Sequence, residues 1–246
     1  MTFCLGISVD EGLVAISDTR LVAGNECLVA RKTAAYQGPG FAFFAMHSGL
    51  RSLRVKTLLY FEEAFARESG ARDRLYRAVN LYAQQVRRVA REDAEALERA
   101  ELKFNLHTMI GGQMGGDSAH RLFLVYPAGN WVEIGPDTPY QSSARRDSAN
   151  PFWNDRSRAA IPWYAFKVGL LAFDATRLCA ADVDFPMDVT LYSRGSFTLV
   201  EQRYKMDDVR EISNWWQERM RSAVHDLPSS WIEAAFSKLT RSELVL

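Results

Sequence analysis

The order in which hydrophobic periods follow one another constrains the fold of this chain more than any single residue does. Four short apolar, β-rich segments come first, and two stretches follow whose apolar residues lie three and four positions apart. Three short segments, a helical stretch, two more short segments and a last helix complete the chain. Because strands and helices come in blocks and do not alternate one by one, the sequence predicts an α+β fold with helices packed outside sheets. The expected strands are 3–9, 13–19, 27–36, 41–47, 104–112, 120–126, 129–134, 187–193 and 196–203, and the expected helices are 50–68, 71–103, 159–177 and 207–226.

The first two segments, FCLGISV (3–9) and LVAISDT (13–19), flank the polar turn Asp10-Glu11-Gly12 and predict a β-hairpin. Their apolar residues are continuous and do not alternate with polar ones, which indicates strands covered on both faces. In the helical stretch 71–103 the apolar residues share one face, and the charges opposite are interpreted as solvated. The residues of that apolar face are Leu75, Val79, Tyr82, Val86 and Val89.

Composition excludes several classes of protein. The 246 residues include 30 Lys and Arg against 30 Asp and Glu, so the net charge gives no reason to expect nucleic-acid or acidic-membrane binding. No window is apolar enough for a membrane helix. The three cysteines, Cys4, Cys27 and Cys179, are far apart and suggest neither a disulfide framework nor a zinc site. We therefore expect a protein of the reducing cytoplasm.

Most familiar catalytic motifs are missing from the sequence. The segment IGGQMGGD (110–117) lacks the GK[ST] ending of a phosphate-binding loop, so Gly112 to Gly116 is interpreted as a turn. The four histidines show no metal-ligand spacing, and no GxSxG elbow is present. We expect no metal and no organic cofactor. The segment 135–158, rich in proline, serine and charge, predicts a long loop, and such loops are often functional.

Thr2 is the candidate nucleophile. Methionine is normally removed when residue 2 is small, and its removal would leave a hydroxyl and a free α-amine on Thr2. The unperturbed pKa of an α-amine is about 7.7–8.0, so a useful fraction is neutral near pH 7 and can accept the hydroxyl proton. This places nucleophile and base on one residue. The alternative is that Thr2 is simply the beginning of a buried strand.

Three further residues could support this chemistry. A nearby ammonium would disfavour protonation of the amine, and a carboxylate would hold that ammonium in place. Asp18 ends the second predicted strand, so a hairpin brings it close to the beginning of the first, and Lys32 lies on the third predicted strand. A backbone N–H must also face the developing oxyanion, and Gly49 after the fourth strand is suited to that role.

Several segments together resemble the proteasome β-subunit superfamily of N-terminal nucleophile hydrolases, and most closely its bacterial Anbu (ancestral β-subunit) branch. They are MTFCLGI, GLVAISDTR, Arg31-Lys32, Ser48-Gly49, the segment 104–140 with its GGQ, YPAGN and TP elements, FDATR and FPMDVTLY. The resemblance spans roughly residues 2–203. It implies a four-layer αββα sandwich, a single proteasome-type domain over 1–246, and a C-terminal helical extension from about residue 205.

The resemblance also implies roles and partners. Thr2 would be the nucleophile, Asp18 and Lys32 its charged partners, and the Gly49 N–H an oxyanion donor. A serine that supports the amine would be Ser143, with Ser142 as the alternative. Family members assemble into homo-oligomeric rings or open helical arrays, and ATP-grasp-like and transglutaminase-like proteins are implied as partners.

Three segments depart from the family pattern. The stretch before Arg31-Lys32 is one residue shorter than the usual Anbu spacing, so the assignment of Lys32 places a gap in the loop 21–27. SSARRDSANP (142–151) does not align with the family sequence, and CAADVD (179–184) replaces a serine-containing stretch, so that Asp182 could stand near the amine and raise its pKa. The leading hypothesis is a self-compartmentalising threonine hydrolase that cleaves peptide or amide bonds. The alternatives are a catalytically silent assembly protein and an amidase that acts on small amides.

Overall fold

The structure is a computed structural model that describes residues 2–23, 26–135, 140–142, 162–230, 232 and 236. Contacts within the chain divide it into two units, Met1–Asp208 and Val209–Leu246, and each is described by itself. Within the described ranges, no helix combines the length and the apolar character needed to cross a membrane.

Two antiparallel five-stranded sheets form the centre of the first unit. One sheet has the strand order β10-β1-β2-β11-β12 and the other has the order β5-β6-β7-β8-β9. The strands of the first sheet are β1 (Cys4–Val9), β2 (Gly12–Asp18), β10 (Tyr140–Ser142), β11 (Met187–Ser193) and β12 (Leu199–Tyr204). Those of the second are β5 (Thr33–Gly38), β6 (Phe41–Ser48), β7 (His107–Met114), β8 (Arg121–Val125) and β9 (Trp131–Glu133). A separate hairpin joins β3 (Arg20–Ala23) to β4 (Glu26–Val29).

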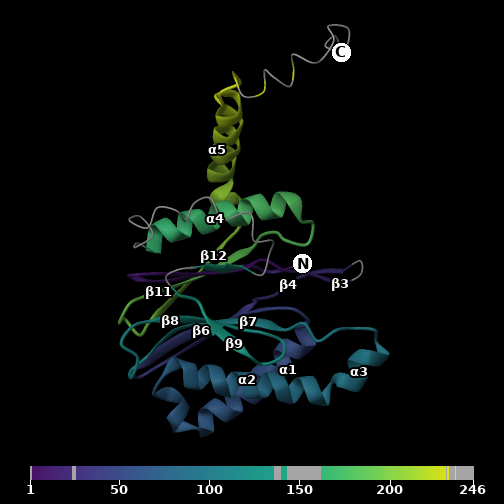
Figure 1. Cartoon of the computed structure of the whole chain (residues 1–246), viewed down its shortest axis with the longest axis vertical. Coiled ribbons are helices and arrows are strands. Elements are labelled where there is room, and N and C mark those ends of the chain that lie inside the picture. Colours follow the sequence, from purple (N-terminus) through teal and green to yellow (C-terminus); the bar gives the residue numbers. More distant parts are fainter. Residues whose placement is uncertain are drawn as a thin grey trace. The chain divides into compact units, whose positions relative to one another are not determined.

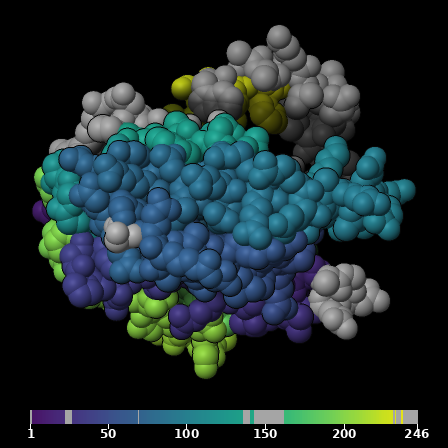
Figure 2. All heavy atoms as spheres, turned by 90° about the horizontal axis from the view of Figure 1, so that it is seen from below, coloured from purple at the N-terminus to yellow at the C-terminus, as the bar shows by residue number. Residues whose placement is uncertain are grey.

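Helices cover the outer face of each sheet, which gives the first unit four layers (Figure 1). The helices α1 (Arg51–Arg67) and α2 (Leu75–Glu92) lie against the sheet of β5 to β9, and α4 (Pro162–Cys179) lies against the other sheet. A short 3-10 turn (Ser69–Arg72) precedes α2, and α3 (Ala94–Arg99) follows it. The predicted αββα sandwich is confirmed. Figure 2 shows the outer face that α1 and α2 cover.

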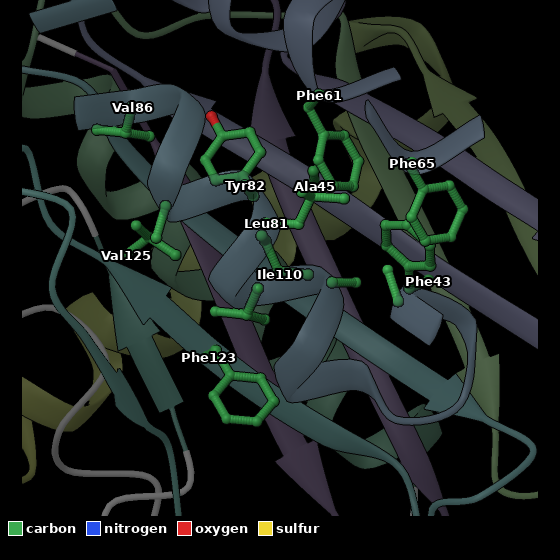
Figure 3. Close-up of a cluster of buried hydrophobic side chains, with 14 of the residues drawn as sticks. Phe43, Ala45, Phe61, Phe65, Leu81, Tyr82, Val86, Ile110, Phe123 and Val125 are labelled. Carbon is green, nitrogen blue, oxygen red and sulfur yellow. The ribbon is translucent and has the colours of Figure 1, made fainter. Parts of the chain in front are cut away.

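Three apolar layers hold these elements together. Between the sheets, Leu13 and Tyr192 of one sheet pack with Phe44, Met46 and Leu122 of the other. Burial of each such side chain contributes about 1.5–3 kcal/mol, and the doubly covered strands explain why their apolar runs are continuous. Between the helices and the second sheet lies an aromatic cluster, much of which Figure 3 shows. It includes Phe43, Phe61, Phe65, Tyr82 and Phe123.

The third layer packs α4 on the outer face of the first sheet. Phe3 meets Phe173 of α4 edge to face, with ring centroids 5.4 Å apart. A Cβ on Gly169 would lie 2.4 Å from the Cδ1 of Ile16, so the absence of a side chain there makes room for Ile16 under the helix.

Several predicted boundaries were wrong. Residues 27–36 are not one strand, because β4 ends at Val29 and β5 begins at Thr33 in a different sheet. Lys32 therefore lies in the connection before β5 and not on a strand. The helix predicted over 71–103 is broken at Asp93, which turns to pair with Lys56 of α1.

The glycine-rich segment 110–117 also differs from its prediction. β7 continues through Gly111 and Gly112 to Met114, and the turn follows it. A Cβ on Gly111 would lie 2.6 Å from the Cζ of Phe44, its partner on β6 of the same sheet, so this glycine leaves room for the Phe44 ring. The predicted face of α2 is confirmed, since all five of its apolar residues are buried. Of the predicted loop 135–158, residues 140–142 form β10, and 136–139 and 143–158 lie outside the described residues.

The described part of the second unit is chiefly helical. The helix α5 (Met206–His225) begins at the end of the first unit and supplies most of the described residues of the second. Its first turn carries Asp207 and Asp208. Acidic side chains are stabilised there because the N-terminal end of a helix is the positive end of its dipole. The single-domain assignment with an extension from about residue 205 stays a prediction.

Candidate active site

Thr2, Asp18 and Lys32 meet at one end of the sandwich. Thr2 lies two residues before β1, Asp18 is the last residue of β2, and Lys32 directly precedes β5. The Lys32 Nζ lies 2.6 Å from the Oδ1 of Asp18 and 3.5 Å from the Oγ1 of Thr2. The Lys32 ammonium therefore connects the Asp18 carboxylate at the end of β2 to the Thr2 hydroxyl before β1.

The β1–β2 hairpin positions Asp18. Its register pairs Cys4 with Ser17, so that Asp18 faces Phe3, and the Asp18 N–H donates to the Phe3 carbonyl at 3.1 Å. The carboxylate in turn accepts the N–H of Phe3 at 2.9 Å and that of Arg20 at 3.1 Å. Burial raises the pKa of Asp18, and the Lys32 ammonium and these two N–H groups oppose that rise. The carboxylate is thus held by three donors in a site closed to water.

His47 of β6 holds the backbone of Lys32. The His47 N–H donates to the Lys32 carbonyl at 2.9 Å, and the ring Nδ1 lies 3.1 Å from the same oxygen. Because a carbonyl only accepts, Nδ1 carries the proton. Full burial lowers the pKa of His47 to about 3, so the imidazole is neutral. Arg54 supports the neighbouring peptide, since its Nη1 donates to the Arg31 carbonyl at 2.6 Å.

Gly49 follows β6 in a conformation that favours glycine. Its φ is +121°, and a Cβ there would lie 2.5 Å from the Asn105 carbonyl oxygen. The side chain of Asn105 accepts the N–H of Leu50 at 3.0 Å and fixes this turn. Within the described ranges, the Gly49 N–H has no hydrogen-bond acceptor. The Cys4 thiol, two residues after Thr2, lies 3.4 Å from the His47 carbonyl and links this end of β6 to β1.

The other predicted residues are two consecutive serines and an aspartate before β11. Ser143 lies outside the described residues, while Ser142 ends β10, opposite Leu5 of β1. Asp182 is partly buried in the connection between α4 and β11. Its neighbour Asp184 forms an ion pair of 3.1 Å with Arg20.

Two pockets, each of about 270 Å³, flank the end of β6. One lies between the sheets, with Cys4, Ser48 and Ser142 in its wall. The other is formed by Lys32, the end of β6 and α1, with His47 and Arg54 in its wall. In the described part of the chain, no group of three or more His, Cys, Asp or Glu side chains could hold a metal ion.

Sequence reasoning missed the residues that hold the predicted ones. His47 acts through the pairing of β5 with β6, which places it beside the Lys32 carbonyl, and Asn105 acts through the pairing of β6 with β7, in which Ser48 lies opposite His107. A lone histidine at the end of an apolar run was the one available signal for His47, and it is a weak one. The catalytic roles of Thr2, Asp18, Lys32, Gly49 and Ser143 stay predictions.

Comparisons with known proteins agree on the fold. No protein-family model matches the chain, and no curated protein matches it in sequence. Among solved structures, an Anbu (Gly-1) mutant from Hyphomicrobium sp. strain MC1 is 27% identical, with a TM-score of 0.82 over 93% of this chain and 98% of that one. Anbu from Yersinia bercovieri is 26% identical, with a TM-score of 0.81 over 92% of this chain and 97% of that one.

A third structure is described as the helical assembly of the Anbu complex from Pseudomonas aeruginosa. It is 26% identical, with a TM-score of 0.83 over 92% of this chain and 97% of that one. The structural resemblance to Anbu predicted from the sequence is confirmed, and the chain has the proteasome-like fold of these proteins.

Proposed function

We propose that this chain, whose fold matches that of Anbu proteins over more than nine-tenths of its length, is a threonine hydrolase that cleaves peptide or amide bonds. The observation that carries the proposal is the contact of Lys32 Nζ with both Asp18, at 2.6 Å, and Thr2 Oγ1, at 3.5 Å. A buried ammonium beside a hydroxyl stabilises the alkoxide character that develops there as the hydroxyl attacks. The arrangement in which Lys32 donates to both Thr2 and Asp18 therefore suits a nucleophile better than a structural threonine.

The proposed reaction begins when removal of Met1 frees the Thr2 α-amine. The amine accepts the hydroxyl proton as Oγ1 attacks the amide carbonyl, and the proton then passes to the leaving nitrogen as the C–N bond breaks. The product of this half is an ester between Thr2 and the acyl group, with release of an amine. Water, deprotonated by the same α-amine, then attacks the ester, and the ammonium returns that proton to Oγ1 as the acyl C–Oγ1 bond breaks and the acid is released.

The neighbouring groups have separate roles in this proposal. Lys32 lowers the pKa of the α-amine by charge repulsion, and Asp18 holds Lys32 in place. The Gly49 N–H, which lacks an acceptor among the described residues, donates to the oxyanion of each tetrahedral intermediate. Ser143, or Ser142 in its place, supports the amine. No metal or organic cofactor enters the reaction.

We further propose that the chain works as a homo-oligomer in the cytoplasm, with its sites enclosed by the assembly. The helical assembly of the Pseudomonas aeruginosa relative, which matches 92% of this chain, supports an open helical array over a closed ring. ATP-grasp-like and transglutaminase-like proteins are the partners that the family resemblance suggests. A panel of peptides and small amides would separate a peptidase from an amidase.

The test is intact-mass measurement after incubation with an epoxyketone, which reacts with a free α-amine and hydroxyl on one residue. We expect loss of Met1 and one adduct per chain, absent from Thr2→Ala. Lys32→Met should slow labelling by about 100-fold. Lys56→Met, which removes an exposed lysine of α1, is the matched control and should leave the rate unchanged. A chain without Met1 that remains unlabelled would identify a silent assembly protein.

A further inference from the structure

Arg54, in the first turn of α1, is a partly buried guanidinium that lacks a carboxylate partner among the described residues. Its Nη1 donates to the Arg31 carbonyl at 2.6 Å, which fixes the direction of the head group. Its Nε is closed off from solvent and has no hydrogen-bond partner in the described part of the chain. The side chain is therefore held in place by the backbone, with its positive charge left uncompensated.

Two of the cations beside Arg54 have carboxylate partners. Lys32 is bound to Asp18 at 2.6 Å, and Arg31 lies 3.2 Å from Glu201. Glu62, which lines the same pocket, accepts the hydroxyl of Tyr36 at 3.0 Å and keeps its negative charge. Unlike Lys32 and Arg31, Arg54 has no anion within ion-pair distance in the ranges that the structure describes.

The unpaired charge of Arg54 destabilises the folded chain, and an anionic ligand that pairs with it would remove part of this cost. Burial, and then repulsion from Arg51, lower the pKa of Arg54, which reflects the unfavourable position of its charge. An unpaired buried charge is among the more destabilising features of a protein, and a carboxylate matches the two parallel N–H donors of a guanidinium.

Arg54 lines a pocket that is large enough for a substrate side chain and lies beside the proposed nucleophile. The pocket of about 270 Å³ has Lys32 and His47 in its wall, together with apolar Val55 and Leu58 of α1. Lys32 also contacts the Thr2 hydroxyl, so the pocket adjoins the proposed nucleophile. Three cations (Arg31, Lys32 and Arg54) and one carboxylate (Glu62) line the pocket beside these apolar side chains, so its formal charge is positive. Such a wall suits a short aliphatic chain that ends in a carboxylate.

We propose that Arg54 determines specificity by binding a carboxylate on the acyl part of the substrate, next to the carbonyl that Thr2 attacks. The inference rests on the proposed function for the position of that carbonyl. The substrate class is a peptide or amide whose acyl residue carries an acidic side chain of glutamate length.

The test separates binding from turnover. Three fluorescent peptides that differ in one acyl residue (Glu, its isostere Gln, or Leu) are titrated by anisotropy into the full-length Thr2→Ala chain. We expect the Glu peptide to bind about 10- to 100-fold more tightly than the Gln peptide, as for hydrogen bonds to charged groups. Arg54→Met in the same background should abolish this preference.

Two further variants keep the result interpretable. Arg54→Lys retains the charge without the two parallel donors and should leave a smaller preference for Glu. Arg67→Met, which removes an exposed arginine at the other end of α1, should behave as the parent chain. Circular dichroism melts establish that each variant is folded.

The outcomes distinguish this inference from the function it builds on. Equal binding of the Glu and Gln peptides, or a preference that survives in a folded Arg54→Met chain, would overturn the role of Arg54 while leaving Thr2 as the nucleophile. A preference that depends on Arg54, in a chain whose Thr2 no epoxyketone labels, would support the carboxylate site and refute the hydrolase.

Discussion

Two lysine–carboxylate pairs of this protein have the same length and opposite surroundings. Lys32 lies 2.6 Å from Asp18, and Lys56 of α1 lies 2.6 Å from Asp93 at the end of α2. The first pair is 2% and 0% exposed, whereas the second is 31% and 26% exposed. Burial raises the pKa of Asp18, while hydrogen bonds from Lys56 to Asp93 and Glu92 raise the pKa of Lys56.

Contact distance therefore says little about what an ion pair does. The exposed pair connects two helices and is screened by water, so its contribution to stability is small. The buried pair is surrounded by backbone donors and is aimed at a hydroxyl, so that removing either partner leaves an uncompensated charge. The Lys32–Asp18 pair therefore positions the Lys32 ammonium beside Thr2, but it adds little net stability compared with apolar side chains of similar volume in the same place.

The largest expected effect is that of Asp18→Asn. The change leaves the Lys32 ammonium buried without a counter-ion, and the new amide cannot accept both backbone N–H groups that Asp18 accepts. We expect a loss of about 3–5 kcal/mol in the free energy of unfolding, measured by urea denaturation at pH 7. The matched change Asp93→Asn should lose less than about 1 kcal/mol. Equal losses would mean that burial does not separate the two pairs.

The buried Lys32–Asp18 pair could be predicted from the sequence because the position of Asp18 depends on a short hairpin. The turn at Asp10-Glu11-Gly12 sets the hairpin register, and that register alone brings Asp18 to the beginning of β1. Gly49 was recognisable because it ends an apolar strand. The fold class could be predicted in the same way, because the order of strand-like and helix-like segments can be seen directly in the sequence.

Strand pairing determines the positions of the residues that the sequence did not predict correctly. Lys32 was assigned to a strand because CLVARKTAAY is uniformly β-rich, but the chain changes sheets there, between Val29 and Thr33. Asn105 is connected to the site through the pairing of β6 with β7, whose strands are separated by three α-helices, and His47 through the pairing of β5 with β6, which brings it to the Lys32 carbonyl. No local pattern encodes the register of β6 with β7, and the contacts of the His47 ring required coordinates.

A second prediction concerns what keeps the buried pair in place. The folded-state pKa of His47, about 3, is lower than the ordinary value of about 6.5. As the pH falls below 6.5, the unfolded chain therefore binds a proton that the folded chain does not, and stability decreases by about 1.4 kcal/mol per pH unit. His47→Asn keeps a donor for the Lys32 carbonyl and removes this titration.

We expect the stability of His47→Asn relative to the parent to rise by about 1 kcal/mol between pH 6.5 and pH 5.5. Urea denaturation at several pH values measures the difference, in which titration of the other groups cancels. The control is His225→Asn, which makes the same substitution at a histidine that is 90% exposed and should leave the stability at pH 7 unchanged. A constant difference between His47→Asn and the parent would show that His47 takes up its proton in the folded protein.

The smallest expected effect is that of salt on the two pairs. At 1 M salt the Debye length is about 3 Å, so exposed charges are largely screened whereas charges closed off from solvent are not. The destabilisation caused by Asp93→Asn should therefore fall by a few tenths of a kcal/mol between 0.05 and 1 M NaCl, measured by thermal or urea unfolding. That caused by Asp18→Asn should stay constant over the same range, because the Lys32 charge remains out of reach of counter-ions at 2% exposure. If salt relieved both penalties equally, ions or water would have access to the Lys32 site in the folded chain, and the low dielectric on which its effect on the Thr2 amine depends would be absent.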